Sequence, residues 1–140
     1  MDTISKARRS WNMSRIRGRD TRPERIVRSL LHGLGHRFRL HKQCLAGRPD
    51  IVLPKYRVVV LVHGCFWHRH RQCRFAYNPK SNESFWARKF EDNVTRDRKV
   101  LRALRREGWR VLVVWECQTA RPVRLRTRLK QFISFSGATR

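Results

Sequence analysis

Two continuous apolar runs, separated by one long charged segment, constrain the fold of this chain more than any other feature of its sequence. Residues 57–62 (RVVVLV) and 110–117 (RVLVVWEC) lack the alternation of a half-exposed strand, which predicts two strands buried on both faces. Residues 83–106 between them carry apolar side chains near helical spacing, and Gly108 follows as a helix stop. A strand, a helix and a strand in this order form a βαβ unit, which predicts parallel pairing with a right-handed crossover.

Four shorter segments complete the predicted secondary structure. They are a helix at 21–35, a short alternating strand at 36–41, a strand at 50–54 and a final basic helix at 120–135. The first helix has Thr21 as its cap and Gly35 as its stop. The strand at 50–54 can form a hairpin with the apolar run that follows it. The sequence therefore predicts an α/β fold, with a small mixed β-sheet of a hairpin plus a parallel strand, flanked by helices.

The charge of the chain indicates what it binds. Lysine and arginine number 34 against 10 acidic residues, so the formal net charge is +24. A charge this uneven opposes compaction and favours a polyanion as partner, and arginine, the commoner of the two cations, has a planar fork that suits phosphate. We therefore expect a nucleic-acid partner rather than a basic protein that merely coats RNA or a membrane. The 140 residues fit one domain, which we expect at 21–140, after a basic arm at 1–20.

The first residues show no signal-peptide pattern, and no apolar run is long enough to span a bilayer. We therefore expect a reducing, cytoplasmic environment and no membrane partner. In that compartment the four cysteines are better explained as thiols or metal ligands than as disulfides. Cys44 stands apart from the others and is interpreted as a small buried hydrophobe.

The stretch HGCFWHRHRQC, residues 63–73, concentrates cysteine and histidine. Cys65, His70 and Cys73 have the spacing C-x4-H-x2-C, and parallel pairing of the two apolar strands would bring Cys117 to the same edge of the sheet. Three thiolates and one imidazole form a closed tetrahedral set, which is typical of structural zinc. A closed site leaves no free coordination position, so this zinc would fasten the loop and not catalyse. The alternative is reduced, buried cysteines beside solvated histidines.

The catalytic candidates lie around the same edge. Asp50 in GRPD begins one strand of the hairpin and Val62 ends the other, so a carboxylate and a backbone carbonyl could together bind magnesium. His68 in the loop could deprotonate water, and Asp97 on the long helix could orient it. Glu24 could reach the site from the first helix.

Each of these residues also has a purely structural interpretation. Asp50 could cap a turn after its proline, and Glu24 could be the second half of a capping box. Asp97 lies between two arginines and could form a surface ion pair, and His63 could be a packed histidine at a strand end. The spacing alone does not choose between these interpretations.

Aromatic residues in the basic loop suggest a second function. Phe66 and Trp67 could insert as a wedge between base pairs, as apolar side chains of DNA-bending proteins do. Trp86 could join them, and Met13 on the basic arm could enter from another groove. The alternative is that Phe66 and Trp86 simply pack the loop against the long helix.

Several motifs together resemble one known family, the very-short-patch-repair DNA mismatch endonucleases, over about residues 6–135. The motifs are RSWNM, GRPDIV, HGCFWHRH, FWARKFEDNVTRDR and GWRVLVVWEC. The family has a core similar to the restriction-endonuclease fold and nicks DNA beside a T:G mismatch left by deamination of 5-methylcytosine, with a magnesium cofactor and a structural zinc. The resemblance implies a monomeric, nucleoid-associated bacterial enzyme that acts on double-stranded DNA and has mismatch-repair proteins as partners.

The resemblance also implies roles for particular residues. Magnesium would be bound by Asp50 and by the backbone carbonyl of Val62, a position where the better-known member has threonine. Glu24 and His63 would hold metal-bound water, and His68 would be the general base with Asp97 as its partner. The implied zinc ligands are Cys65, His70, Cys73 and Cys117. The implied DNA-intercalating residues are Phe66, Trp67, Trp86 and Met13.

The loop departs from the family pattern in length, because it has one extra residue before its second cysteine. Counting forward from Cys65 places the ligand at His70, whereas counting back from Cys73 reaches Arg71, which cannot bind zinc. The extra residue is therefore expected after His70.

Two other function classes stay open on the sequence. One is a zinc-stabilised nucleic-acid-binding module without catalysis, for example on the ribosome, which explains the charge and the cysteines but not GRPD or the aromatic pair. The other is a restriction-type nuclease that acts on matched duplex, which shares the metal core and differs in its substrate.

Overall fold

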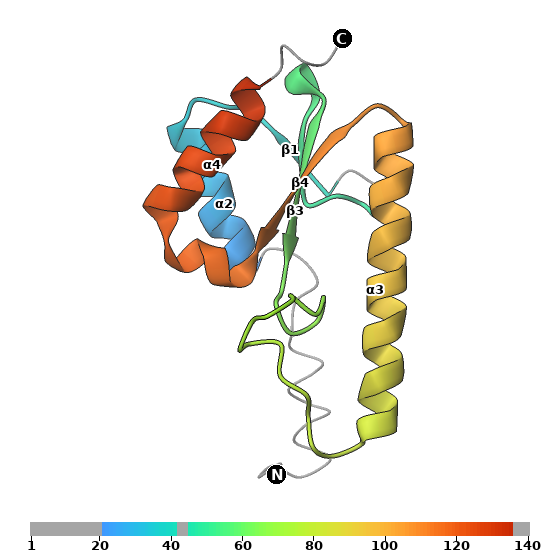
Figure 1. Cartoon of the computed structure of the whole chain (residues 1–140). Coiled ribbons are helices and arrows are strands. Elements are labelled where there is room, and N and C mark those ends of the chain that lie inside the picture. The colour runs from blue at the N-terminus through green and yellow to red at the C-terminus, as the bar shows by residue number, and fades with distance from the viewer. Residues whose placement is uncertain (1–20, 42–44, 136–140) are drawn as a thin grey trace.

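The structure is a computed structural model that describes residues 21–41 and 45–135. The expected basic arm at 1–20, with Met13, and Cys44 lie outside the described residues. In the described part, four strands form one mixed sheet between three α-helices (Figure 1). None of the helices described there is both long and apolar enough to cross a membrane.

The sheet has the order β1-β2-β3-β4 and contains the predicted hairpin and parallel pair. Its strands are β1 (Arg39–Leu40), β2 (Ile51–Leu53), β3 (Val58–His63) and β4 (Arg110–Trp115). β1 pairs with β2 and β2 with β3 in antiparallel fashion, whereas β3 and β4 pair in parallel from Val58 opposite Arg110 to His63 opposite Trp115. The parallel pairing inferred from the two apolar runs is thus confirmed.

The first strand is shorter than the sequence predicted, with two residues in place of six. Both of its residues are exposed, and only these two pair with β2, although the preceding Phe38 packs against the core. The chain leaves the strand at His41, which has a left-handed φ of +47°. A non-glycine residue in this region is uncommon, and it marks a sharp turn at this point.

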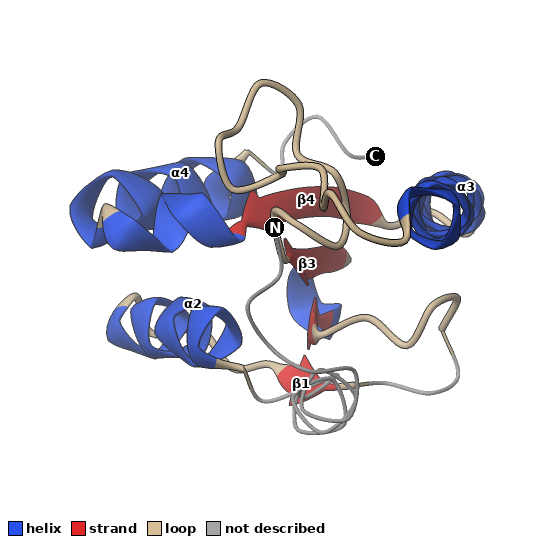
Figure 2. Ribbon diagram, turned by 90° about the horizontal axis from the view of Figure 1, so that it is seen from below, coloured by secondary structure: helices blue, strands red, loops and turns tan. Residues whose placement is uncertain are grey.

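Helices α2 (Arg22–Gly33) and α4 (Pro122–Ser134) confirm two of the predicted helices and cover the same face of the sheet (Figure 2). Thr21 caps α2, because its Oγ1 accepts a hydrogen bond of 3.4 Å from the backbone N–H of Glu24. The helix ends two residues before the expected stop, and Gly35 follows with a φ of +87°. A 3₁₀ turn, η2 (Glu116–Ala120), connects β4 to α4.

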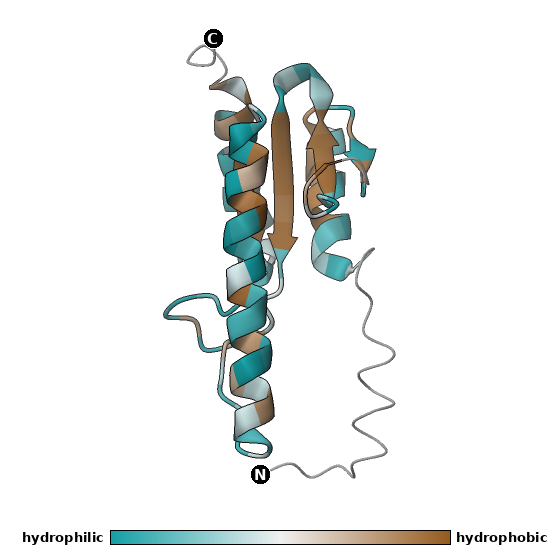
Figure 3. Cartoon of the chain, turned by 90° about the vertical axis from the view of Figure 1, so that its right-hand side faces the viewer, coloured by the Kyte–Doolittle hydropathy of each residue, from teal (hydrophilic) through white to brown (hydrophobic). Residues whose placement is uncertain are grey.

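The core consists of two layers, one on each face of the sheet. Val58 and Val60 point to the side of α2 and α4, whereas Val59 and Leu61 point to the side of α3, since alternate side chains of a strand face opposite ways. All four are buried, and the two long strands are hydrophobic along their length while the helices are mixed (Figure 3). This is the pattern that the continuous apolar runs predicted.

The long helix α3 (Glu83–Arg106) extends well beyond the sheet. Its 24 residues span about 36 Å, whereas a six-residue strand spans about 20 Å. The C-terminal part packs Leu104 against the sheet, and the overhanging N-terminal part lies beside the loop after β3, residues 64–82 (Figure 1). The helix therefore joins the sheet to the loop that carries most of the candidate site.

Candidate active site and metal centres

Three groups of potential metal-binding side chains gather where β3 and β4 end. In each group one ligand atom per residue lies within 4.8 Å of the others, among the residues that the structure describes. We refer to them as the cysteine cluster (Cys65, His70, Cys73, Cys117), the His–Asp cluster (His63, His68, Asp97) and the acidic cluster (Glu24, His41, Asp50).

The cysteine cluster has the spacing of a tetrahedral zinc site. With Zn–S bonds of about 2.3 Å and Zn–N bonds of about 2.0–2.1 Å, tetrahedral ligands place sulfur and nitrogen about 3.6 Å apart. The structure places the Sγ atoms of Cys65 and Cys117 3.6 Å and 3.5 Å from Nδ1 of His70. The residues present therefore fit a zinc ion, and the predicted meeting of Cys117 with the loop is confirmed.

Cys117 reaches the cluster from a different position than expected. The sequence placed it in the last strand, but β4 ends at Trp115 and Cys117 lies in the 3₁₀ turn that follows. Its backbone N–H donates to Sγ of Cys65 at 3.3 Å, and the ring of His70 stacks on Trp115 with centroids 4.2 Å apart. The tight turn thus brings the fourth ligand back over the end of the sheet.

The thiols of this cluster differ in how readily they ionise. Burial raises the pKa of Cys65 to about 12. Burial also acts to raise the pKa of Cys73, but hydrogen bonds from backbone N–H groups of the next turn and from the two other thiols outweigh it and lower that pKa. Cys73 is therefore the first thiol of the cluster to ionise.

The structure brings His70, and not Arg71, into the cysteine cluster. His70 enters the cluster, whereas Arg71 and Gln72 are exposed. Gln72 has a left-handed φ of +56°, which turns the chain back toward Cys73. The two residues between His70 and Cys73 therefore form an exposed turn outside the cluster.

His68 and Asp97 form a close pair, as the sequence predicted. Nδ1 of His68 in the loop lies 2.7 Å from Oδ2 of Asp97 in α3, although the two residues are 29 positions apart in the chain. A carboxylate on Nδ1 fixes the neutral tautomer with its proton on that nitrogen and leaves a lone pair on Nε2. The interpretation of Asp97 as solvent-exposed decoration is not supported, since its side chain is only 20% exposed.

His63 packs against the His68 ring of this pair. Its ring stacks on the ring of His68 with centroids 4.0 Å apart and an interplanar angle of 6°, and it meets Trp115 edge-on. Burial, together with the nearby His68, lowers the pKa of His63 to about 4. His63 is therefore neutral at physiological pH.

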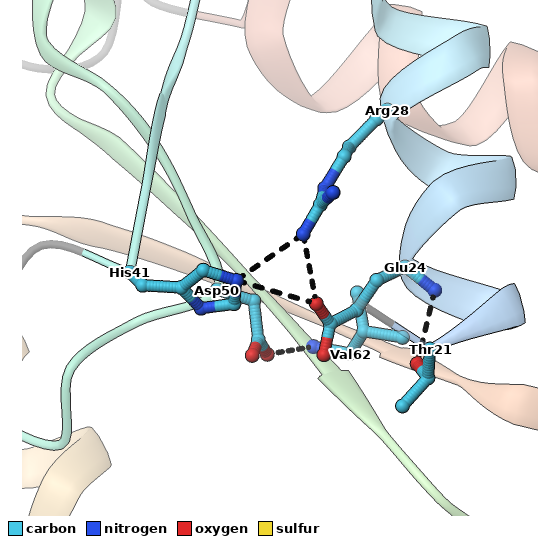
Figure 4. Close-up of polar contacts among 6 residues, drawn as sticks. All are labelled: Thr21, Glu24, Arg28, His41, Asp50 and Val62. Atoms are coloured by element: carbon cyan, nitrogen blue, oxygen red, sulfur yellow. Dashed lines mark hydrogen bonds and ion pairs between the residues drawn. The ribbon is translucent and has the colours of Figure 1, made fainter. Parts of the chain in front are cut away.

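Asp50 lies at the start of β2, with its carboxylate directed at the end of β3 (Figure 4). Its Oδ2 accepts a hydrogen bond of 2.8 Å from the backbone N–H of Val62. Burial raises the pKa of Asp50 to about 7, and the neighbouring Glu24 adds to the effect, while the hydrogen bond from Val62 and the charge of His68 oppose it. A carboxyl with such a pKa needs a cation beside it to be fully ionised near neutrality.

The backbone carbonyl of Val62 has no competitor from the strand opposite. Ile51 pairs with Val60, so the register places Pro49 opposite Val62. The N–H and C=O of a strand residue point the same way, so the Val62 carbonyl faces the same side as the N–H that binds Asp50. Proline has no N–H to donate, which leaves this carbonyl to a ligand.

Glu24 belongs to the acidic cluster rather than to the helix cap alone. Its side chain is 4% exposed, and Oε1 accepts a hydrogen bond of 3.0 Å from Nη2 of Arg28. The same oxygen lies 3.7 Å from Nε2 of His41 (Figure 4). Arg28 and His41 were missed by sequence reasoning. The only signal for His41 was its place at the end of a short strand that pairs beside Asp50.

The aromatic residues of the loop form one cluster with the start of α3. The ring of Phe66 lies 5.1 Å from that of Trp67, 5.5 Å from Trp86 and 5.2 Å from Phe90. Trp86 and Phe90 are 8% exposed, so in this structure Trp86 packs the loop against the helix. Phe66 and Trp67 are partly exposed above it.

Two polar residues that sequence reasoning missed hold this loop in place. Arg69 lies over the ring of Phe90 at 3.9 Å and donates hydrogen bonds to the carbonyls of Ala76 and Tyr77. Buried Asn93 of α3 donates from Nδ2 to the carbonyl of Trp67 at 3.0 Å. An asparagine on the inner face of a long helix was the available signal for such a contact.

A basic groove with a volume of about 1040 Å³ runs beside the cysteine cluster. It lies between the start of α2, the turn η2 and the start of α4, and Phe66 and Phe75 also line it. Its arginines are Arg22, Arg74, Arg121, Arg124 and Arg128.

Comparison with known proteins gives consistent results. Residues 1–74 match the family model for DNA mismatch endonuclease Vsr. The chain is 48% identical to the type II nicking enzyme V.XorIIP of Xanthomonas oryzae pv. oryzae, over 94% of this chain and 96% of that protein. It is 43% identical to DNA mismatch endonuclease Vsr of Escherichia coli, over 99% and 91%. For the type II nicking enzyme V.NmeAIP of Neisseria meningitidis the identity is 40%, over 94% of each chain.

Proposed function

Because the chain belongs to the Vsr family and is a DNA endonuclease, we propose that it nicks one strand of double-stranded DNA beside a T:G mismatch, with magnesium as cofactor. One observation carries this proposal: the Asp50 carboxyl and the His68–Asp97 pair meet at the same edge of the sheet. Asp50 accepts from the N–H of Val62, the next residue, His63, stacks on the ring of His68, and His68 lies 2.7 Å from Asp97. A carboxylate and an oriented imidazole are the groups that metal-assisted phosphodiester hydrolysis needs.

In this proposal Asp50 and the Val62 carbonyl bind the magnesium ion. Both offer oxygen, the ligand that magnesium prefers, and neither is taken by the strand ladder. When bound, the ion supplies positive charge to the phosphate in the transition state and lowers the pKa of water. Glu24 and His63 would hold water molecules of the site, since both are buried beside it and His63 is neutral.

His68 acts as the general base. Its Nδ1–H donates to Asp97, so Nε2 has the lone pair that takes a proton from the attacking water. As the water oxygen bonds to phosphorus, the imidazole becomes positively charged, and the carboxylate of Asp97 stabilises that charge. The stacked, neutral ring of His63 restricts rotation of His68 without adding a competing charge. The bond from phosphorus to the leaving sugar oxygen then breaks, that oxygen takes up a proton from a water molecule, and His68 releases its proton to solvent.

The cysteine cluster would hold a structural zinc ion through Cys65, His70, Cys73 and Cys117. Its spacing supports this role, and its closed set of four ligands leaves no position for substrate. By fastening the loop to η2, the cluster fixes the position of His68, only two residues before His70. The zinc therefore belongs to the framework of the active site and takes no part in the reaction.

The partly exposed Phe66 and Trp67 would provide mismatch selectivity as a wedge, with Trp86 and Met13 as further DNA-intercalating residues. A mispaired step costs less to open than a sound one, which favours insertion at the mismatch. The packing of Trp86 against Phe90 supports a role for it as the base of the wedge. Met13 lies outside the described residues.

The remaining features complete the proposal. Residues 21–140 would form a single, monomeric endonuclease domain with a restriction-endonuclease-like core, and residues 1–20 a basic arm. The arginine-lined groove beside the cysteine cluster supports contact with the phosphate backbone. A DNA substrate places the enzyme in the cytoplasm with the nucleoid, and mismatch-repair proteins would be its partners.

The experiment is a nicking assay with a T:G duplex and a C:G duplex of the same sequence, each with magnesium or with chelator. We expect magnesium-dependent nicking of the T:G duplex alone. Equal nicking of both duplexes would identify a restriction-type enzyme, and binding without nicking would identify a non-catalytic module. Both outcomes would overturn the proposal.

A further inference from the structure

His41 lies in the acidic cluster although nothing in the proposed mechanism uses it. It follows β1, and its backbone N–H donates to the carbonyl oxygen of Asp50 at 3.2 Å, so it is anchored directly beside the proposed metal ligand. Its left-handed φ of +47° turns the chain there. Its Nε2 lies 3.7 Å from Oε1 of Glu24 (Figure 4). Three separate elements thus bring one imidazole nitrogen and two carboxyl groups together.

The ring nitrogen that faces these carboxyl groups is an acceptor. Nη2 of Arg28 lies 3.2 Å from Nε2 of His41 and 3.0 Å from Oε1 of Glu24 (Figure 4). A guanidinium group only donates hydrogen bonds, so a nitrogen this close to it presents its lone pair. A nitrogen lone pair and a carboxylate oxygen therefore converge on one positively charged group.

The distances of the acidic cluster suit a divalent ion. An octahedral ion with bonds of about 2.1 Å places neighbouring ligand atoms about 3.0 Å apart and opposite ones about 4.2 Å apart. The 3.7 Å between His41 and Glu24 lies between these two values, and the ligand atoms of all three residues lie within 4.8 Å of one another. The His41 side chain is 17% exposed, so an ion can reach it from solvent.

We propose that His41 is a further ligand of the catalytic metal ion, through Nε2. This inference rests on the proposed metal-dependent nicking. The ion takes the place of the Arg28 guanidinium between His41 and Glu24, with Asp50 as the shared carboxylate. In this arrangement Glu24 contacts the ion directly instead of through a water molecule. Imidazole suits transition-metal ions better than it suits magnesium, so the affinity of the site for such ions should depend on His41.

The alternative is that His41 only positions Glu24 through Arg28, and it predicts no bond to the ion. Electron spin-echo envelope modulation of bound Mn²⁺ separates the two, because a directly bound imidazole gives a ¹⁴N signal. The probe is Mn²⁺ added to the zinc-loaded full chain without DNA. We expect a ¹⁴N signal in the wild type, its loss in His41→Gln, and Mn²⁺ affinity about 10-fold or more lower in that variant.

His36→Gln is the matched control, since His36 precedes β1 as His41 follows it, but packs edge-on against Tyr56. It should keep both the signal and the affinity. A wild type without a ¹⁴N signal, or a His41→Gln variant that keeps signal and affinity, would overturn the role of His41. Wild-type Mn²⁺ affinity in Asp50→Ala would instead overturn the proposed metal site itself, so the two failures are distinguishable.

Discussion

The cysteine cluster and the acidic cluster lie at the same end of the sheet but differ in how closely their atoms already match a metal site. In the cysteine cluster, sulfur and nitrogen already have the separation of a tetrahedral ion, 3.5–3.6 Å. In the acidic cluster, the pKa of Asp50 is raised to about 7, and Arg28 lies between Glu24 and His41. One cluster already has the spacing of a metal site, whereas the proposed binding of a cation at the other would require its charge and contacts to change.

This difference follows from what holds each cluster. The cysteine cluster is held by backbone hydrogen bonds, from the N–H of His70 to the Cys65 carbonyl at 3.1 Å and from the N–H of Cys117 to the Cys65 sulfur at 3.3 Å. The acidic cluster is joined mainly through side chains from a helix and two strand ends. The proposed zinc site is therefore held by the backbone, and the proposed catalytic site by side chains that can exchange partners.

The largest expected effect comes from breaking the cysteine cluster. Cys117→Ser should lose zinc and lower the free energy of unfolding by at least about 3 kcal/mol, since zinc contributes on the order of 10 kcal/mol in small zinc domains. Nicking should be lost as well, because the loop that carries His68 is released. Zinc content and denaturant unfolding measure this change, with His68→Asn as the control that should retain zinc. Full zinc content in Cys117→Ser would refute the ligand assignment.

The His–Asp cluster should affect rate and leave stability almost unchanged. We expect His68→Asn to lower the single-turnover nicking rate by about 10²–10⁴-fold, the usual contribution of a general base. Asp97→Asn should lower the rate through the same imidazole, so the double variant should be little slower than His68→Asn alone. Multiplicative effects of the two substitutions would show that the residues act independently.

Lowering the pH should reduce the free energy of unfolding through His63, which belongs to the His–Asp cluster. Its folded pKa is about 4, against an ordinary value of 6.5, so the unfolded chain binds a proton between these values that the folded chain does not. The stability that neutral His63 contributes is therefore complete above pH 6.5 and falls by up to roughly 3 kcal/mol as the pH drops to 4. Asp50, with its raised pKa, acts with the opposite sign over much of this window.

Comparison with His63→Gln isolates the histidine, because both proteins keep Asp50 and the cysteine cluster. The difference between their unfolding free energies should shrink from pH 6.5 to pH 4. A difference that stays constant across this window would contradict the lowered pKa of His63.

The smallest expected effect comes from Arg69, which also holds the loop in place. Arg69→Lys keeps the charge but loses the planar contact with Phe90 and the forked hydrogen bonds to Ala76 and Tyr77. We expect a loss of about 1–2 kcal/mol in thermal unfolding with zinc content unchanged. A loss of zinc in this variant would mean that Arg69 and the cysteine cluster do not hold the loop independently.

Much of the framework could be predicted from the sequence, because it depends on local patterns. The apolar runs 57–62 and 110–117 specify the buried strands, and parallel pairing then brings Cys117 to the loop. The predicted length of the first strand was wrong, because only Arg39 and Leu40 pair with β2, and alternation in the sequence does not specify how far pairing extends. The final strand was predicted to end at Cys117 but ends at Trp115, because the chain turns there and the N–H of Cys117 contacts the sulfur of Cys65.

The acidic cluster was only partly predictable. Asp50 and Glu24 could be named from GRPD and from the helix start, but their choice between structural and site roles needed the fold. His41 and Arg28 carried no pattern, because their meeting depends on a left-handed turn after a two-residue strand. Side chains that meet through such irregular backbone leave no periodic trace in a sequence.

The most direct test of the account is the Asp50→Ala variant, assayed in parallel for mismatch binding and for nicking of a T:G duplex with magnesium. We expect mismatch binding to be kept while the nicking rate falls by at least about 10³-fold. Loss of the metal ligand removes several kcal/mol of transition-state stabilisation. Nicking at the wild-type rate by this variant would contradict the central claim that the reaction takes place where β2 begins and β3 ends.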